Sequence, residues 1–331
     1  MKILMIGRGA ISTLYGWALA KAGHTVHYYV RPGRAAQYSP TVQLDLLDAR
    51  TRLQGVRVMG TLSTPLVEDL NADHAYDLIV VSVQHYRFAE VMSFLAERVG
   101  SATVLMFNNL WVGPESAASA LNADQLVWGF PRAGGGFGPG GVLRGSLLKN
   151  VIFGDLGAGA DSSRGRTVRE LFRGSGFGIQ EQRDFRGWLS VHFLINAGLL
   201  PQALKAGSFA KLMSSDAHLR QAVLNVRELL PILSARGIDL KLHAADVAPF
   251  RLPPGLVSLL LRLAFRFSQP VGRVTAALPG EALRQEVRPM TLDVLSEARR
   301  LGVAVPRLEA FSASLEETPT PPTSAQVLTS V

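Results

Sequence analysis

The chain has 331 residues, of which 47% are hydrophobic and 18% are charged, so it can bury a substantial core and is long enough for two domains. It contains no cysteine, which excludes disulfides and thiolate metal sites and is typical of a reducing cytoplasm. The net charge is +8, but the 34 lysines and arginines are scattered, without the basic block typical of nucleic-acid binding. We therefore expect an anionic small molecule as partner, with no nucleic acid and no metal.

Short β-rich runs alternate with helical patterns through the N-terminal half, which predicts an α/β domain with a parallel sheet. The first pair is a buried strand at 2–7 and a helix at 11–24. Valine, tyrosine and other β-forming residues predict further strands at 25–30, 77–83, 103–108, 126–131 and 151–156. Seven glycines and a proline at 132–145 predict a turn or hairpin, whose backbone can approach a ligand closely.

After residue 183 the pattern changes to long helical periodicities, which predict an all-α domain. We expect helices at 185–204, 208–213, 215–236, 241–249, 254–268 and 287–301. The simplest division is an α/β sheet domain at 1–183, a helical domain at 184–316 and a tail at 317–331. The tail is rich in proline, threonine and serine, which predicts a poorly ordered segment.

Two segments bear on export and membranes. The opening MKILMIGRG has an apolar run of only four residues, far shorter than the core of a signal peptide. The stretch LVSLLLRLAFRF at 256–267 is interrupted by Arg262 and Arg266 and is about half the ~20 residues needed to cross a bilayer. We interpret it as a buried amphipathic helix, with an interfacial helix as the alternative, and expect a cytoplasmic protein without a membrane partner.

The segment GRGAIS, between the first strand and the first helix, is the most informative local pattern. Gly7 would permit a tight turn, and Gly9 would let the backbone approach a pyrophosphate. The N–H groups of Ala10 and Ile11, at the start of the helix, would point at the phosphates. Ser12 replaces the third glycine of G-x-G-x-x-G, but it is small and can donate to phosphate. The position of this motif directly after a strand predicts a dinucleotide site.

The end of the second strand predicts which cofactor binds. Sites that prefer NAD place an acid there, whereas this chain has none before Asp45. Arg31 and Arg34 instead offer guanidinium groups to a 2′-phosphate, which favours NADPH, unless both are solvated turn residues. Gln84 and Asn108 follow two later strands and are placed for ribose or nicotinamide contacts, with a turn or capping role as the alternative for each.

Four places in the chain resemble the ketopantoate reductase (2-dehydropantoate 2-reductase) family, and together they span about residues 1 to 315. They are MKILMIGRGAIS at the start, Arg31, FNN at 107–109 with Asn108, and EVRPMTLDVLSEARRLGVAVP at 286–306. The resemblance implies a Rossmann domain and a helical domain, with NADPH and substrate between them. It also implies hydride transfer to the ketone of a small 2-keto acid, and it places Glu286 at the family's active-site glutamate.

The chain departs from the family pattern near its active site. Aligning FRGWLSVHFLIN at 185–196 through Asn196 puts Trp188 at the family's proposed catalytic lysine, and His192 where the family often has asparagine. Gln84 stands where many members have lysine. These departures concern the carbonyl chemistry rather than the fold.

Trp188, His192 and Asn196 are spaced by four residues, so they would share one face of the predicted helix. We expect His192 to act as acid or orienting donor, because it titrates near neutrality. Asn196 would bind substrate or nicotinamide, Glu286 would hold a substrate hydroxyl or amine, and Trp188 would form an apolar wall. Alternatively, His192 is a buried core residue and Glu286 pairs with a neighbouring arginine on the surface.

The preferred interpretation is an NADPH-dependent reductase of ketopantoate or a related 2-keto acid. Trp188, His192 and Asn196, which we call the column, would then line its substrate site. A second is a reductase of a bulkier ketone or an imine, because indole in place of a cation adds a flat apolar surface. A third, from another class, is a non-catalytic NADP(H)-binding protein. A homodimer is an open possibility.

Overall fold

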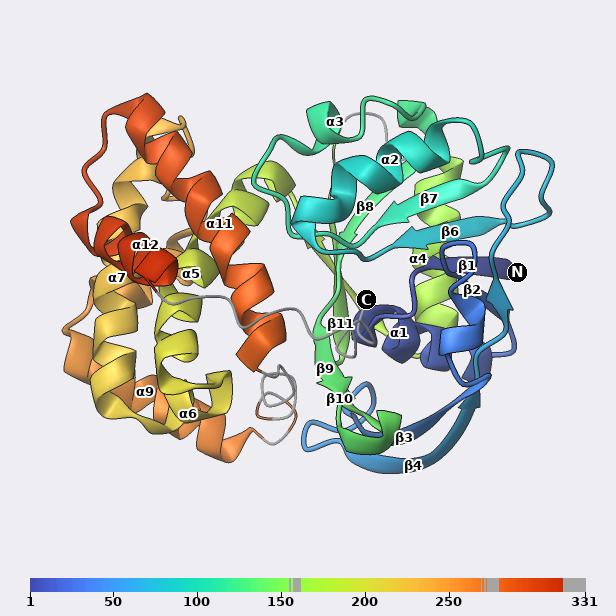
Figure 1. Ribbon diagram of the computed structural model, residues 1–331, viewed down its shortest axis with the longest axis horizontal. Coiled ribbons are helices and arrows are strands. Elements are labelled where there is room, and N and C mark those ends of the chain that lie inside the picture. Colours follow the sequence, from blue (N-terminus) through green and yellow to red (C-terminus); the bar gives the residue numbers. More distant parts are fainter. Residues whose placement is uncertain (155, 157–161, 269, 271, 273–279, 318–331) are drawn as a thin grey trace. The chain divides into compact units, whose positions relative to one another are not determined.

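The computed structural model describes residues 1–154, 156, 162–268, 270, 272 and 280–317 (Figure 1). Within these residues the chain divides into two compact units, Met1–Phe185 and a second unit that begins at Arg186. Most of the predicted tail, 318–331, lies outside the described residues.

The first unit is built on a sheet whose described strands follow the order β5-β2-β1-β6-β7-β8-β11-β12. From β5 to β8 all neighbours pair in parallel, which confirms the predicted parallel sheet over this part. The expectation is wrong beyond it, because β11 runs antiparallel to β8. The strands are β1 Lys2–Ile6, β2 Thr25–Tyr29, β5 Leu66–Val67, β6 Leu78–Val81, β7 Thr103–Met106, β8 Leu126–Phe130, β11 Asn150–Gly154 and β12 Gly178–Gln182.

Helices cover both faces of this sheet, as two neighbouring residues of β2 show. Tyr28 packs against α1 (Ala10–Lys21) at Gly16, where an added methyl group would overlap its ring. Tyr29 packs against Phe94 of α2 (Phe88–Ala96), with ring centroids 4.7 Å apart. Successive strand residues point to opposite faces, so α1 and α2 lie on opposite sides of the sheet (Figure 1). The unit also contains α3 Pro114–Ala117, α4 Ser163–Gly174, η1 Ala35–Gln37, η2 His85–Arg87, η3 Ala123–Gln125 and η4 Pro139–Gly141.

A second sheet, with the order β4-β3-β10-β9, packs against the other side of α1. Its strands are β3 Thr41–Asp48, β4 Val56–Ser63, β9 Ala133–Phe137 and β10 Leu143–Leu147. The predicted hairpin at 132–145 is confirmed, since β9 and β10 pair antiparallel. Leu143 and Leu147 of β10 share a core with Leu14 of α1, so the hairpin packs on this helix. Lying between two sheets, α1 is buried from Ser12 through Leu19.

The second unit is helical throughout its described residues, as predicted. Helix α11 begins at 280 rather than at 287, because the polar stretch before Pro289 hides its helical pattern and the proline does not end it. The final helix, α12, was not predicted. The elements are α5 Phe185–Ala206, α6 Phe209–Ser214, α7 Asp216–Ala235, α8 Ala244–Val247, η6 Ala248–Arg251, α9 Pro254–Phe267, α11 Gly280–Leu301 and α12 Pro306–Glu317.

Helices α5 and α7 approach closely at Gly198, where an added Cβ would lie 2.7 Å from the Val226 nitrogen. Two hydrogen bonds join the same helices. Asn225 Nδ2 donates to the Gly198 carbonyl oxygen over 3.3 Å, and His218 Nδ1 lies 3.2 Å from Gln202 Oε1. The absent side chain of Gly198 therefore lets α7 support α5, which carries the predicted column.

Helix α9 corrects the expectation of a buried helix at 256–267. Val257 and Ser258 are buried, and Ser258 Oγ donates to Asp216 Oδ1 of α7 over 2.7 Å. Apolar side chains spaced by three or four residues are 40 to 69% exposed, and we call them the α9 stripe: Leu256, Leu259, Leu260, Leu263 and Phe267. Among the described residues, no helix has the length and apolar character needed to cross a membrane.

Candidate cofactor and substrate site

The candidate cofactor site lies where the strand order of the main sheet reverses. The chain leaves β1 to form α1 and then β2 on one side of it, and later forms β6 on the other side. Ligands of open α/β sheets bind at such a point, beside the carboxyl ends of the strands. Gly7 follows β1 and Ser82 follows β6, so both residues stand at this point.

Gly7 and Gly9 form the turn between β1 and α1. Gly7 has a φ of +82°, which glycine adopts without strain, and its N–H donates to the Tyr29 carbonyl oxygen over 2.9 Å. A Cβ added at either glycine would meet no atom within 4 Å, so both border open space. No side chain of the described residues caps α1, and its first turn has no acid. The N–H groups of Ala10 and Ile11 are therefore available to an anion.

Ser12 is 2% exposed, and its hydroxyl bonds within the protein. Its Oγ lies 2.8 Å from Ser82 Oγ and 3.4 Å from the Ile6 carbonyl oxygen, to which it donates. These bonds join the first turn of α1 to the carboxyl ends of β1 and β6. Ser12 therefore shapes the turn, rather than presenting its hydroxyl to a phosphate.

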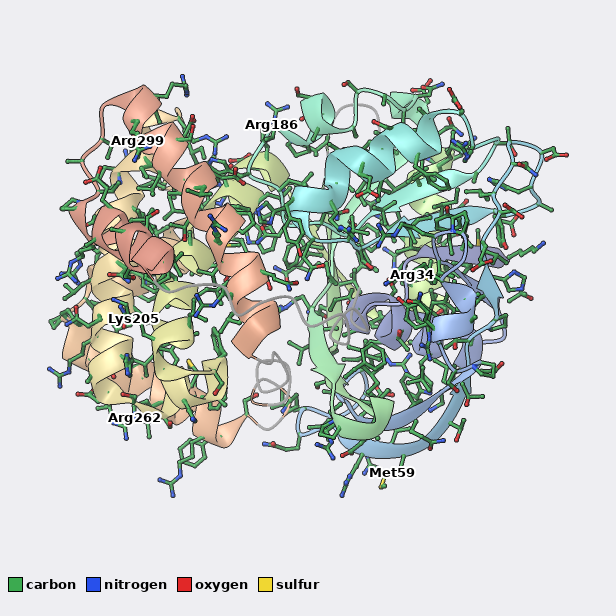
Figure 2. The ribbon with its side chains drawn as sticks, viewed as in Figure 1. Arg34, Met59, Arg186, Lys205, Arg262 and Arg299 are labelled. Atoms are coloured by element: carbon green, nitrogen blue, oxygen red, sulfur yellow. The ribbon has the colours of Figure 1, made fainter. Side chains whose placement is uncertain are left out.

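The loop after β2 carries the predicted arginines. Arg31 is exposed, and Arg34 lies at the start of η1 (Figure 2). Glu68, which follows β5, accepts a hydrogen bond from the Ala35 N–H over 2.6 Å. The sequence could not reveal this carboxylate, because β5 is only two residues long and reaches β2 by parallel pairing. Through this hydrogen bond, the Glu68 carboxylate holds the loop in place.

Asn108 and Gln84 follow neighbouring strands, as expected. Asn108 is 3% exposed, and its Nδ2 donates to the Val83 carbonyl oxygen over 2.6 Å. Its buried Oδ1 has no hydrogen-bond partner in the described part of the chain, which is costly unless a ligand supplies a donor. Gln84 is half-buried directly before η2. The open space at the glycines and the unsatisfied Oδ1 both fit a bound dinucleotide.

The predicted column is present on α5. The rings of Trp188 and His192 stack with centroids 5.1 Å apart and an interplanar angle of 18°. His192 Nε2 lies 3.2 Å from Asn196 Nδ2, an amide donor, so a neutral imidazole in this pair carries its proton on Nδ1. Trp188 is 8% exposed, whereas His192 and Asn196 are half-buried. The three side chains form one connected row.

Glu286 lies near the start of α11 and is half-buried. Pro289 lies one turn further along the same helix. The approach of Glu286 to the column on α5 stays a prediction. Sequence reasoning also missed Arg8, which stands between the two glycines and is held by contacts with residues 38 to 64 of the chain.

The comparisons with known proteins agree with this architecture. Residues 3–156 match the family model described as ketopantoate reductase PanE/ApbA. No curated protein matches the chain. The 2-dehydropantoate 2-reductase from Geobacter metallireducens GS-15 is 19% identical with a TM-score of 0.66, over 96% of this chain and 99% of that chain.

Two further solved structures share the fold. D-mandelate dehydrogenase with NADH and anilino(oxo)acetate is 15% identical with a TM-score of 0.68, over 96% of this chain and 97% of that chain. A dimeric ketopantoate reductase from Staphylococcus aureus is 12% identical with a TM-score of 0.64, over 96% and 98% of the two chains. The expected fold, an α/β unit followed by a helical one, is thereby confirmed. Over residues 3–156, the chain is similar to the ketopantoate reductase PanE/ApbA family.

Proposed function

We propose that the protein is an NADPH-dependent oxidoreductase that reduces the carbonyl of a small 2-keto acid, with ketopantoate as the first substrate to test. The observation that carries this proposal is the glycine turn at the reversal point of the sheet, whose two glycines border open space. When bound there, NADPH supplies the hydride. The family match over residues 3–156 supports the same reaction class.

Backbone and side-chain groups of the first unit would hold the cofactor. Gly7, Gly9 and the first N–H groups of α1 would bind the diphosphate. Arg31 would bind the 2′-phosphate. The Glu68 carboxylate accepts a hydrogen bond from the Ala35 N–H rather than serving as the acid that holds the ribose of NADH, and this supports NADPH as the cofactor. Gln84 and Asn108 would contact the ribose or the nicotinamide, and Asn108 Oδ1 is an acceptor available to an amide donor.

On α5, His192 would donate a proton to the oxygen of the substrate carbonyl as negative charge develops there. Asn196 Nδ2 lies 3.2 Å from His192 Nε2 and would orient the imidazole toward this role. Trp188 stacks on the imidazole ring of His192 and would form an apolar wall. Glu286 would bind a hydroxyl or amine of the substrate.

An aryl-bearing 2-keto acid is the second candidate substrate. The buried indole of Trp188 gives the column a flat apolar surface where the family has lysine, and such a surface suits an aromatic ring. The fold shared with D-mandelate dehydrogenase, solved with anilino(oxo)acetate, supports the same choice. Ketopantoate has no aromatic ring, so the two candidates are easily distinguished.

The deciding experiment is an NADPH-consumption screen over ketopantoate, phenylglyoxylate, other 2-keto acids and cyclic imines. Turnover of any 2-keto acid supports the proposed reaction, and the best substrate selects between the two candidates. Turnover of imines alone would mean that the enzyme reduces a C=N bond instead of a carbonyl. Tight NADPH binding without turnover of any compound would establish the non-catalytic alternative.

We also propose a cytoplasmic homodimer that buries the α9 stripe against a second copy. Exposed contiguous apolar patches mark interaction surfaces, and the Staphylococcus aureus relative of the same fold is dimeric. Light scattering after size-exclusion chromatography should give twice the chain mass, and Leu259→Glu with Leu263→Glu should give the monomer. A monomeric wild type that binds vesicles of anionic lipid would instead assign the stripe to a membrane surface.

A further inference from the structure

Arg8 stands between Gly7 and Gly9, and its side chain is held on three sides. Its Nε donates to Thr64 Oγ1 over 3.2 Å, and its Nη2 donates to the Thr41 carbonyl oxygen over 3.3 Å. The guanidinium carbon lies 5.1 Å from the centre of the Tyr38 ring, a cation–π distance. The long side chain therefore has a defined position beside the glycine turn.

The groups that hold Arg8 are themselves firmly placed. Thr64 is completely buried, and its hydroxyl donates to the Pro40 carbonyl oxygen over 3.2 Å. Tyr38 directly follows η1, on the loop that also carries Arg31. The Arg8 guanidinium thus lies toward the β2 side of the glycine turn, where a dinucleotide of the proposed kind has its adenosine ribose.

Among the residues that the structure describes, no acid balances the charge of Arg8. Its hydrogen-bond acceptors are a hydroxyl and a carbonyl oxygen, and no carboxylate of the described residues lies within 4 Å of it. Burial lowers the pKa of Arg8, which shows that its surroundings disfavour the cation. A guanidinium has five N–H donors, so donors remain for an anion that would compensate this cost.

We propose that Arg8 and Arg31 together bind the 2′-phosphate of NADPH, so that Arg8 is a determinant of cofactor selectivity. The inference rests on the proposed function and extends it to a residue within the glycine turn. Guanidinium groups bind phosphate oxygens through paired N–H donors, and two arginines approaching from different segments can hold one phosphate from two directions. Thr64, Thr41 and Tyr38 serve to position Arg8.

The test compares the binding of NADPH and NADH to the wild type, Arg8→Met and Arg8→Lys by fluorescence titration. Arg8→Met keeps much of the apolar stem and removes the charge, so the Kd for NADPH should rise about tenfold or more. The Kd for NADH, which lacks the 2′-phosphate, should change less than about twofold. Arg8→Lys should fall between, because it keeps the charge and loses the planar fork.

A double-mutant cycle with Arg31→Ala sharpens the assignment. If both arginines hold one phosphate, the fold-increase in the NADPH Kd of the double variant should differ from the product of the fold-increases of the two single variants. Arg52→Ala is the matched control, an exposed arginine in the turn between β3 and β4. Thr64→Val removes the acceptor of Arg8 Nε and should weaken NADPH binding by less than Arg8→Met does.

Two outcomes would overturn the role of Arg8. Equal losses for NADPH and NADH would assign it to the diphosphate or to folding, and unchanged binding of both would remove it from the site. Thermal melting of each variant distinguishes a folding defect from lost binding. A wild type that binds neither nucleotide would instead refute the proposed function itself, so the two failures are separable.

Discussion

The glycine turn of the first unit and the column on α5 are built in different ways. At the turn, a ligand would meet backbone N–H groups and the open space beside Gly7 and Gly9. On α5 it would meet side chains, which are connected by ring stacking and a hydrogen bond. Any residue but proline supplies a backbone N–H, whereas a row of side chains changes its chemistry with each substitution.

This difference bears on how each feature would tolerate substitution. The third glycine of the motif is replaced by Ser12, yet the turn keeps its shape because the hydroxyl bonds to Ser82 and Ile6. At Trp188, where the resemblance implies a lysine, indole offers a single N–H donor and no positive charge. We therefore expect substitutions in the column on α5 to alter the reaction more than they alter nucleotide binding.

Replacing His192 by alanine should cause the largest loss, because it removes the proposed proton donor. General acid catalysis contributes typically about 100- to 10,000-fold, so kcat with the best 2-keto acid should fall within that range. The NADPH Kd should stay unchanged in a fluorescence titration. The control is His218→Ala, which removes an imidazole that lies beside Gln202, outside the column. If His192→Ala kept a kcat close to that of the wild type, His192 would have a structural role rather than that of proton donor.

Gly9→Val should weaken NADPH binding about 100-fold, which corresponds to about 2.7 kcal/mol. The new side chain meets no protein atom within 4 Å of its Cβ, so thermal stability should hold while the space for the diphosphate is filled. Isothermal titration measures the affinity. Gly60→Val is the matched control, because its Cβ also meets open space, but in β4. Equal affinities of Gly9→Val and wild type would place the cofactor elsewhere.

Arg31→Ala should raise the NADPH Kd about tenfold and leave the NADH Kd unchanged, because only NADPH carries the phosphate. The comparison of the two nucleotides separates selectivity from general binding. Arg52→Ala should affect neither nucleotide. If Arg31→Ala binds NADPH as the wild type does, this exposed arginine is a solvated turn residue.

Ser12→Ala should have the smallest effect, a loss of about 1 kcal/mol in the free energy of unfolding, because one buried hydrogen bond is removed. NADPH affinity should change less than about threefold. Urea unfolding measures the stability, and Ser119→Ala, at an exposed serine, is the control. A large loss of affinity with unchanged stability would instead mean that the Ser12 hydroxyl binds phosphate.

Local patterns predicted much of the fold and the column. The glycine motif identified the β1–α1 turn, and the spacing of four placed Trp188, His192 and Asn196 in one row. Features that depend on distant pairing were missed. Strand β3 buries alternate residues only because it joins β4 and β10, and Glu68 reaches the β2 loop only through β5. Burial was also misjudged at α9, since an apolar face does not reveal what covers it.

The carboxyl end of β6 is fastened on both sides by side chains. Ser82 bonds to Ser12 from the β1 side, and the Val83 carbonyl oxygen accepts from Asn108 on the β7 side. Both bonds lie within the protein, so we expect the rim of the proposed cofactor site to be preorganised, with part of the entropic cost of binding met during folding. Slow amide hydrogen exchange in this turn should therefore already be present in the free protein and should change little when nucleotide is added.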